Sequence, residues 1–169
     1  KKREWHFDIA FGLLDGVVRA KRPARLPLVL TRAEARLLFA RMDGAPLLAC
    51  RLLYGSGLRL LECLQLRVKD IGFERNEITV RDGKGQKDRR TMLPPGLEAP
   101  LLAHLIQVQK RFERDRLRGG VNVALPDRLA RKYPKASLDW PWQWVFPATR
   151  TWLDPTSGKR FHHHLHESV

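Results

Sequence analysis

The chain of 169 residues contains little cysteine, little tyrosine and no long apolar run. Its two cysteines, Cys50 and Cys63, both lie among leucines, which argues against a disulfide framework and favours reduced thiols in a protein core. No apolar stretch approaches the ~18 residues that a membrane-spanning helix needs. The N-terminal run Lys1–His6 is not followed by the apolar segment of a signal peptide. These scarcities predict a cytoplasmic protein without a membrane partner.

Acidic residues are also scarce beside basic ones. The chain has 18 Asp and Glu against 32 Lys and Arg, a formal net charge of +14 and a pI of about 10.7. Because 43% of the residues are hydrophobic, the chain can bury a core, so the charge belongs to a folded protein. Such an excess indicates a polyanionic partner, nucleic acid before any other. A basic protein of ribosomal type, or one that is merely soluble, is the alternative.

The first 26 residues have the composition of a short tail followed by a linker. Residues 5–18 carry an apolar pattern that is too short for a domain of its own. Residues 19–27 are basic and punctuated by proline, and their cations, Lys21 and Arg22 among them, are predicted to lie along a phosphate backbone. A solvated tether explains this segment equally well. Residues 27–169 are predicted to form the folded domain.

The pattern after the linker predicts helices first. A capping box at Thr31–Glu34 starts a helix that should reach about Met42, and Pro46 suits the first turn of the next helix. A turn at Gly55 and Gly57 then leads into a helix from Arg59 to about Arg67. A further long helix is predicted over 95–118. The apolar face of the Arg59 helix should consist of Leu58, Leu61, Leu64 and Leu66.

Between these helices the periodicity changes to that of short strands. Residues 68–73, 77–81 and 90–94 read as three strands, and the hairpin tip 82–90 joins the second to the third. Glycines on both sides of Lys84 would let this tip approach another backbone closely, although an ordinary polar turn is the alternative. The predicted fold class is therefore α+β and mainly helical, with a small antiparallel three-stranded sheet.

Arg59 is the first candidate for chemistry. A planar, permanently charged guanidinium at the start of a packed helix can grip a phosphate through two hydrogen bonds. Glu62 lies three residues further on, on the same side of the helix, where it could orient that guanidinium. For this pair taken alone, a surface ion pair on an amphipathic helix is the simpler interpretation.

Basic and aromatic residues occur together in the last third of the chain. A short basic helix is predicted near 125–134, and three tryptophans follow within 140–144. Aromatic rings beside cations suit stacking on unpaired bases, but at least one of the tryptophans should be core. The terminal histidines allow three interpretations: a metal site, for which no Cys or acidic partner stands at convincing spacing, an expression tag, for which the sequence is poor, and contact with nucleic acid. No metal site is predicted.

With Arg59 and Lys84 both placed, the chain resembles the tyrosine recombinase (phage integrase) family, from Leu30 to the last residue. The stretch Tyr54–Glu62 is similar to the family box T-G-L-R-x-x-E, and the Asp70 strand and the hairpin Gly83-Lys84-Gly85-x-Lys87 stand at the expected distance. Within the family, the insertion at about 121–147 and the motif His163–Glu167 resemble the integron integrase branch.

The resemblance implies site-specific DNA recombination and integration through a 3′-phosphotyrosine, with no cofactor. Arg59 would stabilise charge on the phosphoryl oxygens, Lys84 would protonate the leaving 5′-oxygen, and Glu62 would support Arg59. A non-catalytic basic DNA-binding module is the alternative. The predicted DNA contacts are Lys21, Arg22, Lys87, Arg89, Arg90, Arg131, Lys132, Trp142, Trp144, His163 and His164.

The resemblance also implies a domain arrangement and partners. Residues 1–26 would end a core-binding domain, and 27–169 would be the N-terminal part of a catalytic domain, truncated before the H-x-x-R box and the nucleophilic tyrosine. Tyr54 and Tyr133 fall in the wrong boxes to replace that tyrosine, so we expect a fragment that does not complete catalysis. Its parent would act in the bacterial cytoplasm, as a tetramer on double-stranded and folded single-stranded recombination sites.

Overall fold

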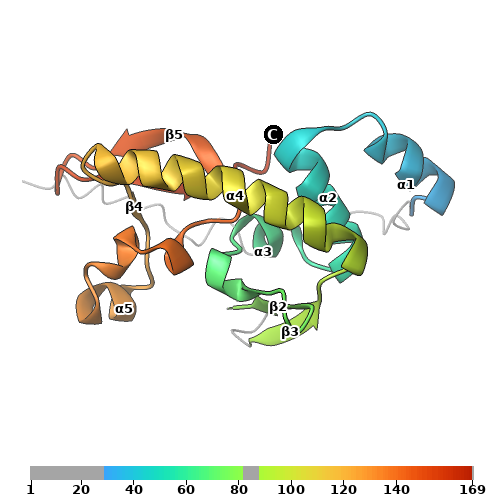
Figure 1. Ribbon diagram of the computed structural model, residues 1–169, viewed down its shortest axis with the longest axis horizontal. Coiled ribbons are helices and arrows are strands. Elements are labelled where there is room, and N and C mark those ends of the chain that lie inside the picture. Colours follow the sequence, from blue (N-terminus) through green and yellow to red (C-terminus); the bar gives the residue numbers. More distant parts are fainter. Residues whose placement is uncertain (1–28, 82–87, 169) are drawn as a thin grey trace, which may run out of the picture.

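The computed structural model describes residues 29–81 and 88–168 of the chain. Its longest element is helix α4 (Pro95–Leu117), which crosses the middle of the molecule. Figure 1 shows helices α1 (Arg32–Phe39) and α2 (Gly44–Ser56) toward one end of α4, and two small sheets at separate places along it. The fold is mixed α+β, as the sequence predicts.

The first two helices follow from local sequence signals. The hydroxyl of Thr31 accepts a hydrogen bond from the N–H of Glu34 at 3.3 Å, and the Glu34 carboxylate accepts one from the N–H of Thr31 at 2.8 Å. This capping box confirms the predicted start of α1, although α1 ends at Phe39 and not near Met42. Helix α2 ends at Ser56 because Gly57 takes a left-handed φ of 61°.

Gly55 has a different role from the predicted turn. It lies inside α2, where a Cβ atom would stand 2.6 Å from Cγ of Pro94. Glycine therefore permits close contact between α2 and the residue that precedes α4.

Helix α3 (Leu60–Leu64) is shorter than the predicted helix from Arg59 to Arg67. Arg59 is its N-cap residue, with extended backbone angles, and the helix stops before Gln65. The apolar face is predicted correctly except at Leu61, which is 47% exposed. Because α3 has barely more than one turn, Leu58 before it and Leu66 after it are buried by the extended chain and not by helical spacing.

The first sheet confirms the predicted antiparallel order. Strands β1 (Ile71–Gly72), β2 (Glu77–Val80) and β3 (Arg89–Met92) lie in the order β1-β2-β3 in the sheet, and Val80 lies opposite Arg89. Residues Val68–Asp70 form a 3₁₀ turn and not the start of the first strand.

The sequence analysis missed a second sheet. It consists of β4 (Asn122–Val123), β5 (Pro147–Leu153) and β6 (Arg160–His164) in the order β4-β6-β5, with β4 parallel and β5 antiparallel to β6. Helix α5 (Asp127–Lys132), the predicted short basic helix, follows β4 in the chain. The run Arg-Phe-His-His-His of β6 lacks the apolar alternation that would mark a strand.

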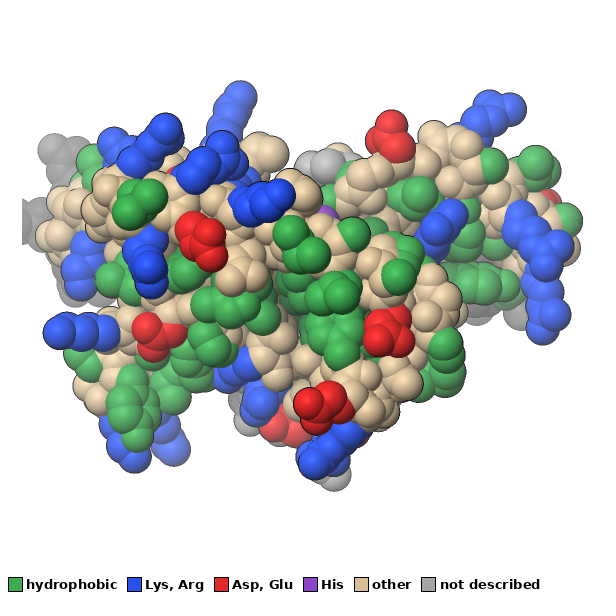
Figure 2. Space-filling view, in the orientation of Figure 1, with side chains coloured by type: hydrophobic (Ala, Val, Ile, Leu, Met, Phe, Trp, Pro, Cys, Tyr) green, Lys and Arg blue, Asp and Glu red, His purple; other side chains and the backbone are tan. Residues whose placement is uncertain are grey.

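The main core joins α2, α3 and α4 to the first sheet. Leu52, Leu66, Ile78 and Leu101 are buried there, and Phe146, at the end of the predicted insertion, is 1% exposed in the same cluster. The insertion is thus anchored in the domain core. In the described part of the chain, no helix is both long and apolar enough to span a membrane. The face covered by α4 shows apolar side chains at its centre and cations toward its edges (Figure 2).

Candidate nucleic-acid interface

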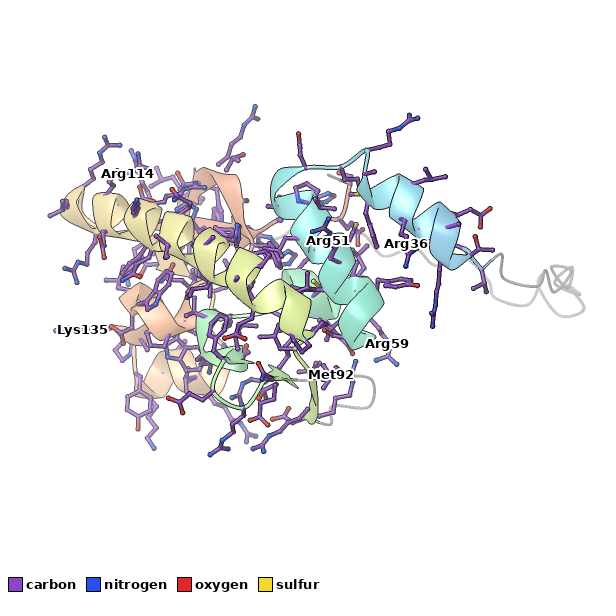
Figure 3. The ribbon with its side chains drawn as sticks, turned by 45° about the vertical axis from the view of Figure 1, so that its right-hand side comes forward. Arg36, Arg51, Arg59, Met92, Arg114 and Lys135 are labelled. Carbon is purple, nitrogen blue, oxygen red and sulfur yellow. The ribbon has the colours of Figure 1, made fainter. Side chains whose placement is uncertain are left out.

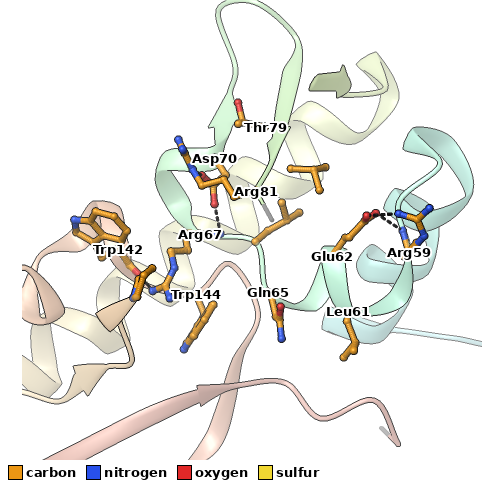
Figure 4. A pocket seen from close by; sticks show the side chains of 13 residues that line it. Arg59, Leu61, Glu62, Gln65, Arg67, Asp70, Thr79, Arg81, Trp142 and Trp144 are labelled. Carbon is orange, nitrogen blue, oxygen red and sulfur yellow. Dashed lines mark hydrogen bonds and ion pairs between the residues drawn. The ribbon is translucent and has the colours of Figure 1, made fainter. Parts of the chain in front are cut away.

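A cleft of about 500 Å³ opens between α3, the first sheet and the insertion (Figure 4). Its wall combines arginines with two indole rings, which suits a ligand that carries both phosphates and flat bases. Acidic side chains are present as well, and each is engaged by arginine. The residues that line the cleft are Arg59, Leu61, Glu62, Gln65, Leu66, Arg67, Asp70, Thr79, Val80, Arg81, Pro126, Trp142 and Trp144.

Glu62 connects two of the predicted site residues. Its Oε1 accepts a hydrogen bond from Nη1 of Arg59 at 2.7 Å, and its Oε2 accepts one from Nη2 of Arg89 at 2.6 Å and one from the N–H of Arg59 at 2.8 Å. Burial opposes ionisation of this carboxyl group, but the hydrogen bonds from both arginines outweigh it and lower the pKa of Glu62. The carboxylate is therefore charged at neutral pH and holds the guanidinium group of Arg59, which lines the cleft, together with that of Arg89.

Asp70 is a second carboxylate held by arginine. It is 4% exposed, it accepts a hydrogen bond from the N–H of Arg67 at 3.0 Å, and it accepts another from Nε of Arg81 at 2.8 Å. The latter bond joins Arg81, the residue after β2, to the 3₁₀ turn Val68–Asp70. Nη1 of Arg81 also lies 3.7 Å from the carboxylate of Asp88, the residue that precedes β3. The two strand ends that bracket residues 82–87 thus lie beside the cleft.

Arg67 ties the insertion to the rest of the domain, a role that the sequence analysis missed. Its Nη1 donates to the carbonyl oxygen of Trp142 and its Nη2 to that of Ala124, both at 2.6 Å. Its guanidinium carbon lies 3.9 Å from the centroid of the Trp144 ring. Burial lowers the pKa of Arg67 to about 10, with partial compensation from Asp70, so the group remains charged at neutral pH.

Lys69 is a second residue that the sequence analysis missed. Its Nζ lies 3.0 Å from the centroid of the Trp142 ring, a close cation–π contact. Burial and the nearby charge of Arg81 lower the pKa of Lys69 to about 8. The available signal was the run Arg67-Val68-Lys69-Asp70, three charged residues in four directly after the buried Leu66.

Trp142 and Trp144 differ in how much of each ring solvent can reach. Trp144 is 7% exposed, and its Nε1 donates to the carbonyl oxygen of His162 at 3.1 Å. Trp142 is partly exposed, with one face against Lys69. The expectation that at least one tryptophan is core is thus confirmed at Trp144.

Three of the terminal histidines, His162, His163 and His164, lie on β6. His164 is partly buried, its Nε2 lies 3.3 Å from Nε2 of Gln65 in the cleft, and its ring meets that of Trp144 edge to face. His163 is exposed, with its ring centroid 4.1 Å from that of His164. Burial lowers the pKa of His164, and the nearby His163 adds to this effect. In the described residues, no three His, Cys, Asp or Glu side chains are grouped as a metal site.

The remaining predicted contacts fall in three groups. Arg90 points to the other side of β3 from Arg89, and its Nη1 lies 3.8 Å from Glu77. Arg131 and Lys132 are exposed on α5 and do not line the cleft, although Pro126, the N-cap residue of the same helix, does. The predicted residues Lys21, Arg22, Lys84 and Lys87 lie outside the described ranges. Figure 3 shows Arg114 and Lys135 toward one end of the molecule and Arg59 and Met92 nearer its middle, with Arg36 on α1 beyond them.

Comparison with known proteins identifies the family. Residues 29–165 match the model of the phage integrase family, and the chain belongs to this family. It is 43% identical over 156 residues to an integrase/recombinase from Escherichia coli, which covers 92% of this chain and 46% of that protein. It is also 38% identical over 98 residues to the tyrosine recombinase XerA from Pyrococcus furiosus, which covers 56% of this chain and 33% of that protein.

Among solved structures, a XerA recombinase crystal structure superposes with a TM-score of 0.45 and 29% identity, over 54% of this chain and 34% of the other. The chain thus spans about half or less of the length of these relatives.

Proposed function

We propose that this chain is the part of a site-specific DNA recombinase that binds DNA and supplies the first catalytic arginine. The observation that supports this most strongly is the shared carboxylate of Glu62, which holds Arg59 and Arg89 together at the edge of a cleft that Arg67 and Arg81 also line. Fixed cations at this density suit a phosphodiester backbone.

Arg59 suits a role at the reacting phosphate. Its side chain is 57% exposed, and Glu62 engages only one of its two terminal nitrogens. Within the described residues no further bond to this guanidinium is found, so its remaining donors can reach a ligand while Glu62 keeps it in position. A cation fixed in advance stabilises negative charge that develops on the phosphoryl oxygens without reorganisation during the reaction.

Lys84 would supply the proton in this proposal. Lys84 lies in the chain between Arg81, which lines the cleft, and Arg89, which is bound to Glu62, and the proposal is that this segment brings its ammonium group to the phosphate held by Arg59. In the reaction, a tyrosine oxygen of the complete enzyme attacks phosphorus, the bond from phosphorus to the 5′-oxygen breaks, and the lysine ammonium gives that oxygen its proton. No cofactor is required, because the phosphotyrosine keeps the energy of the broken bond.

The insertion supports the integron integrase branch as the finer proposal. Trp142 of the insertion lines the cleft, His164 on β6 lies 3.3 Å from Gln65 there, and the ring centroid of His163 is 4.1 Å from that of His164. These groups could hold bases that are unpaired in a folded single strand. The same proposal includes the bacterial cytoplasm and a tetramer on DNA.

Strand cleavage by a longer protein that contains this chain tests the catalytic proposal. A nicked DNA substrate traps the covalent protein–DNA complex. With the unchanged protein, this complex should accumulate. Arg59→Ala and Lys84→Ala should each slow its formation by about 10²–10³-fold, while Lys84→Ala leaves DNA affinity nearly unchanged.

Arg128→Ala, which removes an exposed arginine on α5, is the matched control for lost charge. DNA binding without a covalent complex under any condition would favour the alternative, a non-catalytic DNA-binding module.

A further inference from the structure

His162 is the buried histidine of β6, and its side chain joins this strand to helix α4. It is 7% exposed, and its Nε2 lies 3.0 Å from the carboxylate of Asp115 on α4. Figure 1 shows the second sheet beside the C-terminal half of α4, to which Asp115 belongs. Since a carboxylate only accepts hydrogen bonds, Nε2 of His162 carries a proton and is the donor.

The other ring nitrogen of His162 favours the uncharged imidazole. Nδ1 is buried and has no hydrogen-bond partner among the described residues. Protonation would place an N–H group on this atom, and a buried donor without an acceptor is destabilising. Burial lowers the pKa of His162, the bond to Asp115 opposes this effect, and the charge of Arg111 adds to it. The ring is therefore neutral at pH 7.

Two charged groups face this ring, and both belong to α4. Nε of Arg111 lies 3.9 Å from the carboxylate of Asp115, and Nη2 of Arg111 donates to the carbonyl oxygen of Thr149 on β5 at 2.7 Å. A cavity of about 20 Å³ lies beside His162, and the other described residues that line it are uncharged. The strand neighbours of His162 on β4 and β5 are uncharged as well.

The backbone of His162 connects this anchor to the cleft. Its carbonyl oxygen accepts a hydrogen bond from Nε1 of Trp144 at 3.1 Å, and Trp144 lines the cleft. Two residues further along β6, on the same face of the strand, Nε2 of His164 lies 3.3 Å from Nε2 of Gln65. The positions of both rings at the cleft therefore depend on where α4 holds the strand.

We propose that His162 is a positioning residue, which holds β6 against α4 through Asp115 and so sets the places of Trp144 and His164 at the cleft. This inference rests on the proposed function for its effect on DNA binding, while the contact itself lies outside the cleft. Below pH 6.5 the unfolded chain binds a proton at His162 before the folded chain does, so the anchor weakens toward acid pH.

Two substitutions of His162 separate its hydrogen bond from its volume. His162→Gln keeps an N–H donor for Asp115 but cannot be protonated, whereas His162→Leu keeps only apolar volume. The 169-residue chain is titrated at pH 7 with a DNA hairpin that carries unpaired bases and with a fully paired duplex. His162→Leu should lower the ratio of the two affinities by about five-fold, and His162→Gln should preserve it.

The pH profile and a matched control exclude a merely structural role. As the pH falls below 6.5, urea unfolding should show a larger loss of stability for the unchanged chain than for His162→Gln. The control is His104→Leu, since His104 is a partly buried histidine of α4 whose Nε2 lies 2.8 Å from the carbonyl oxygen of Val145. It should lower stability and leave the ratio of affinities unchanged.

Solvent exchange of the Trp144 indole N–H, followed by nuclear magnetic resonance, is a readout that needs no DNA. His162→Leu should accelerate this exchange, and His162→Gln should not. An exchange rate or a ratio of affinities that His162→Leu leaves unchanged would overturn the inference. Failure of His162→Gln to preserve both would also overturn it, because packing of the ring and not its hydrogen bond would then hold β6. If the unchanged chain bound neither DNA, the proposed function would be overturned, and the indole exchange would still decide the role of His162.

Discussion

The guanidinium of Arg67 lies over the ring of Trp144, with 3.9 Å between its central carbon and the ring centroid. The same guanidinium donates hydrogen bonds to the carbonyl oxygens of Ala124 and Trp142. One side chain that follows α3 therefore fixes two separate parts of the insertion. The position of the indoles in the cleft depends on this arginine.

Arg67→Ala should detach the insertion from the domain. Two carbonyl oxygens would lose a charged donor and one indole would lose its cation, so we expect the free energy of unfolding to fall by about 2–4 kcal/mol. Arg67→Lys should restore little of it, because one ammonium group cannot reproduce the fork that reaches both carbonyls. Urea unfolding checks this, with Arg128→Ala on the exposed side of α5 as the control. Equal stability of Arg67→Ala and the control would contradict the role of Arg67.

Trp142 and Trp144 should respond differently to replacement by alanine. Trp144 is buried, so Trp144→Ala should lower stability by about 3–5 kcal/mol and weaken all DNA binding equally. Trp142→Ala should weaken binding to DNA with unpaired bases by about 1–3 kcal/mol and leave duplex binding nearly unchanged. The measurement is the ratio of the two affinities beside a thermal melt of each variant. An unchanged ratio for Trp142→Ala with a lowered melting temperature would make this residue structural.

Glu62 should make stability depend on acid pH. Its pKa is lowered in the folded chain, so its contribution is present above the unfolded value near 4.5 and is lost as pH falls through the folded value. At pH 7, Glu62→Gln should cost about 1–3 kcal/mol, as expected for hydrogen bonds to charged groups. In urea unfolding, the difference in free energy of unfolding between Glu62→Gln and the unchanged chain should shrink as the pH falls from neutral to acid. The control is Glu74→Gln, an exposed carboxylate between β1 and β2. A difference that is constant with pH would mean that the pKa of Glu62 is the same in the folded and the unfolded chain, so that the arginines do not lower it.

Lys69 should make stability depend on alkaline pH. Its folded pKa of about 8 lies below the unfolded value, so the unfolded chain binds more protons between about pH 8 and 10.4. The free energy of unfolding should therefore rise with pH across that window relative to that of Lys69→Met. We expect a rise of only about 1 kcal/mol, because solvent screens this partly exposed group. Lys110→Met, on the exposed face of α4, is the control. A difference that does not change with pH would show that the Trp142 ring keeps this ammonium charged.

Phosphate contacts should make DNA affinity strongly dependent on salt. Each neutralised phosphate releases condensed counterions, so the logarithm of the binding constant should fall linearly with that of the salt concentration. Arg81→Ala should reduce the slope by about one contact, because this arginine lines the cleft. A titration at several salt concentrations measures both slopes. Affinity that does not depend on salt would contradict an electrostatic interface.

The sequence by itself determined the local elements and one part of the site. The capping box at Thr31 and the long apolar pattern of α4 are local signals, and both predictions are confirmed. The pairing of Glu62 with Arg59 could also be predicted, since residues three apart at a helix start meet whatever the rest of the chain does. The family follows from motifs in which the order of residues carries the information.

Only the tertiary structure decided which distant residues meet. Arg67 reaches Ala124 and Trp142, residues 57 and 75 positions away, and no periodicity records such a contact. The second sheet was missed because the pairing of β6 with its neighbours, and not its own polar sequence, makes it a strand. Trp142 and Trp144 are two residues apart in an aromatic run, yet packing against Arg67 and His162 buries one ring and leaves the other partly open. Burial is a property of what covers a side chain, and here the covering residues come from distant segments.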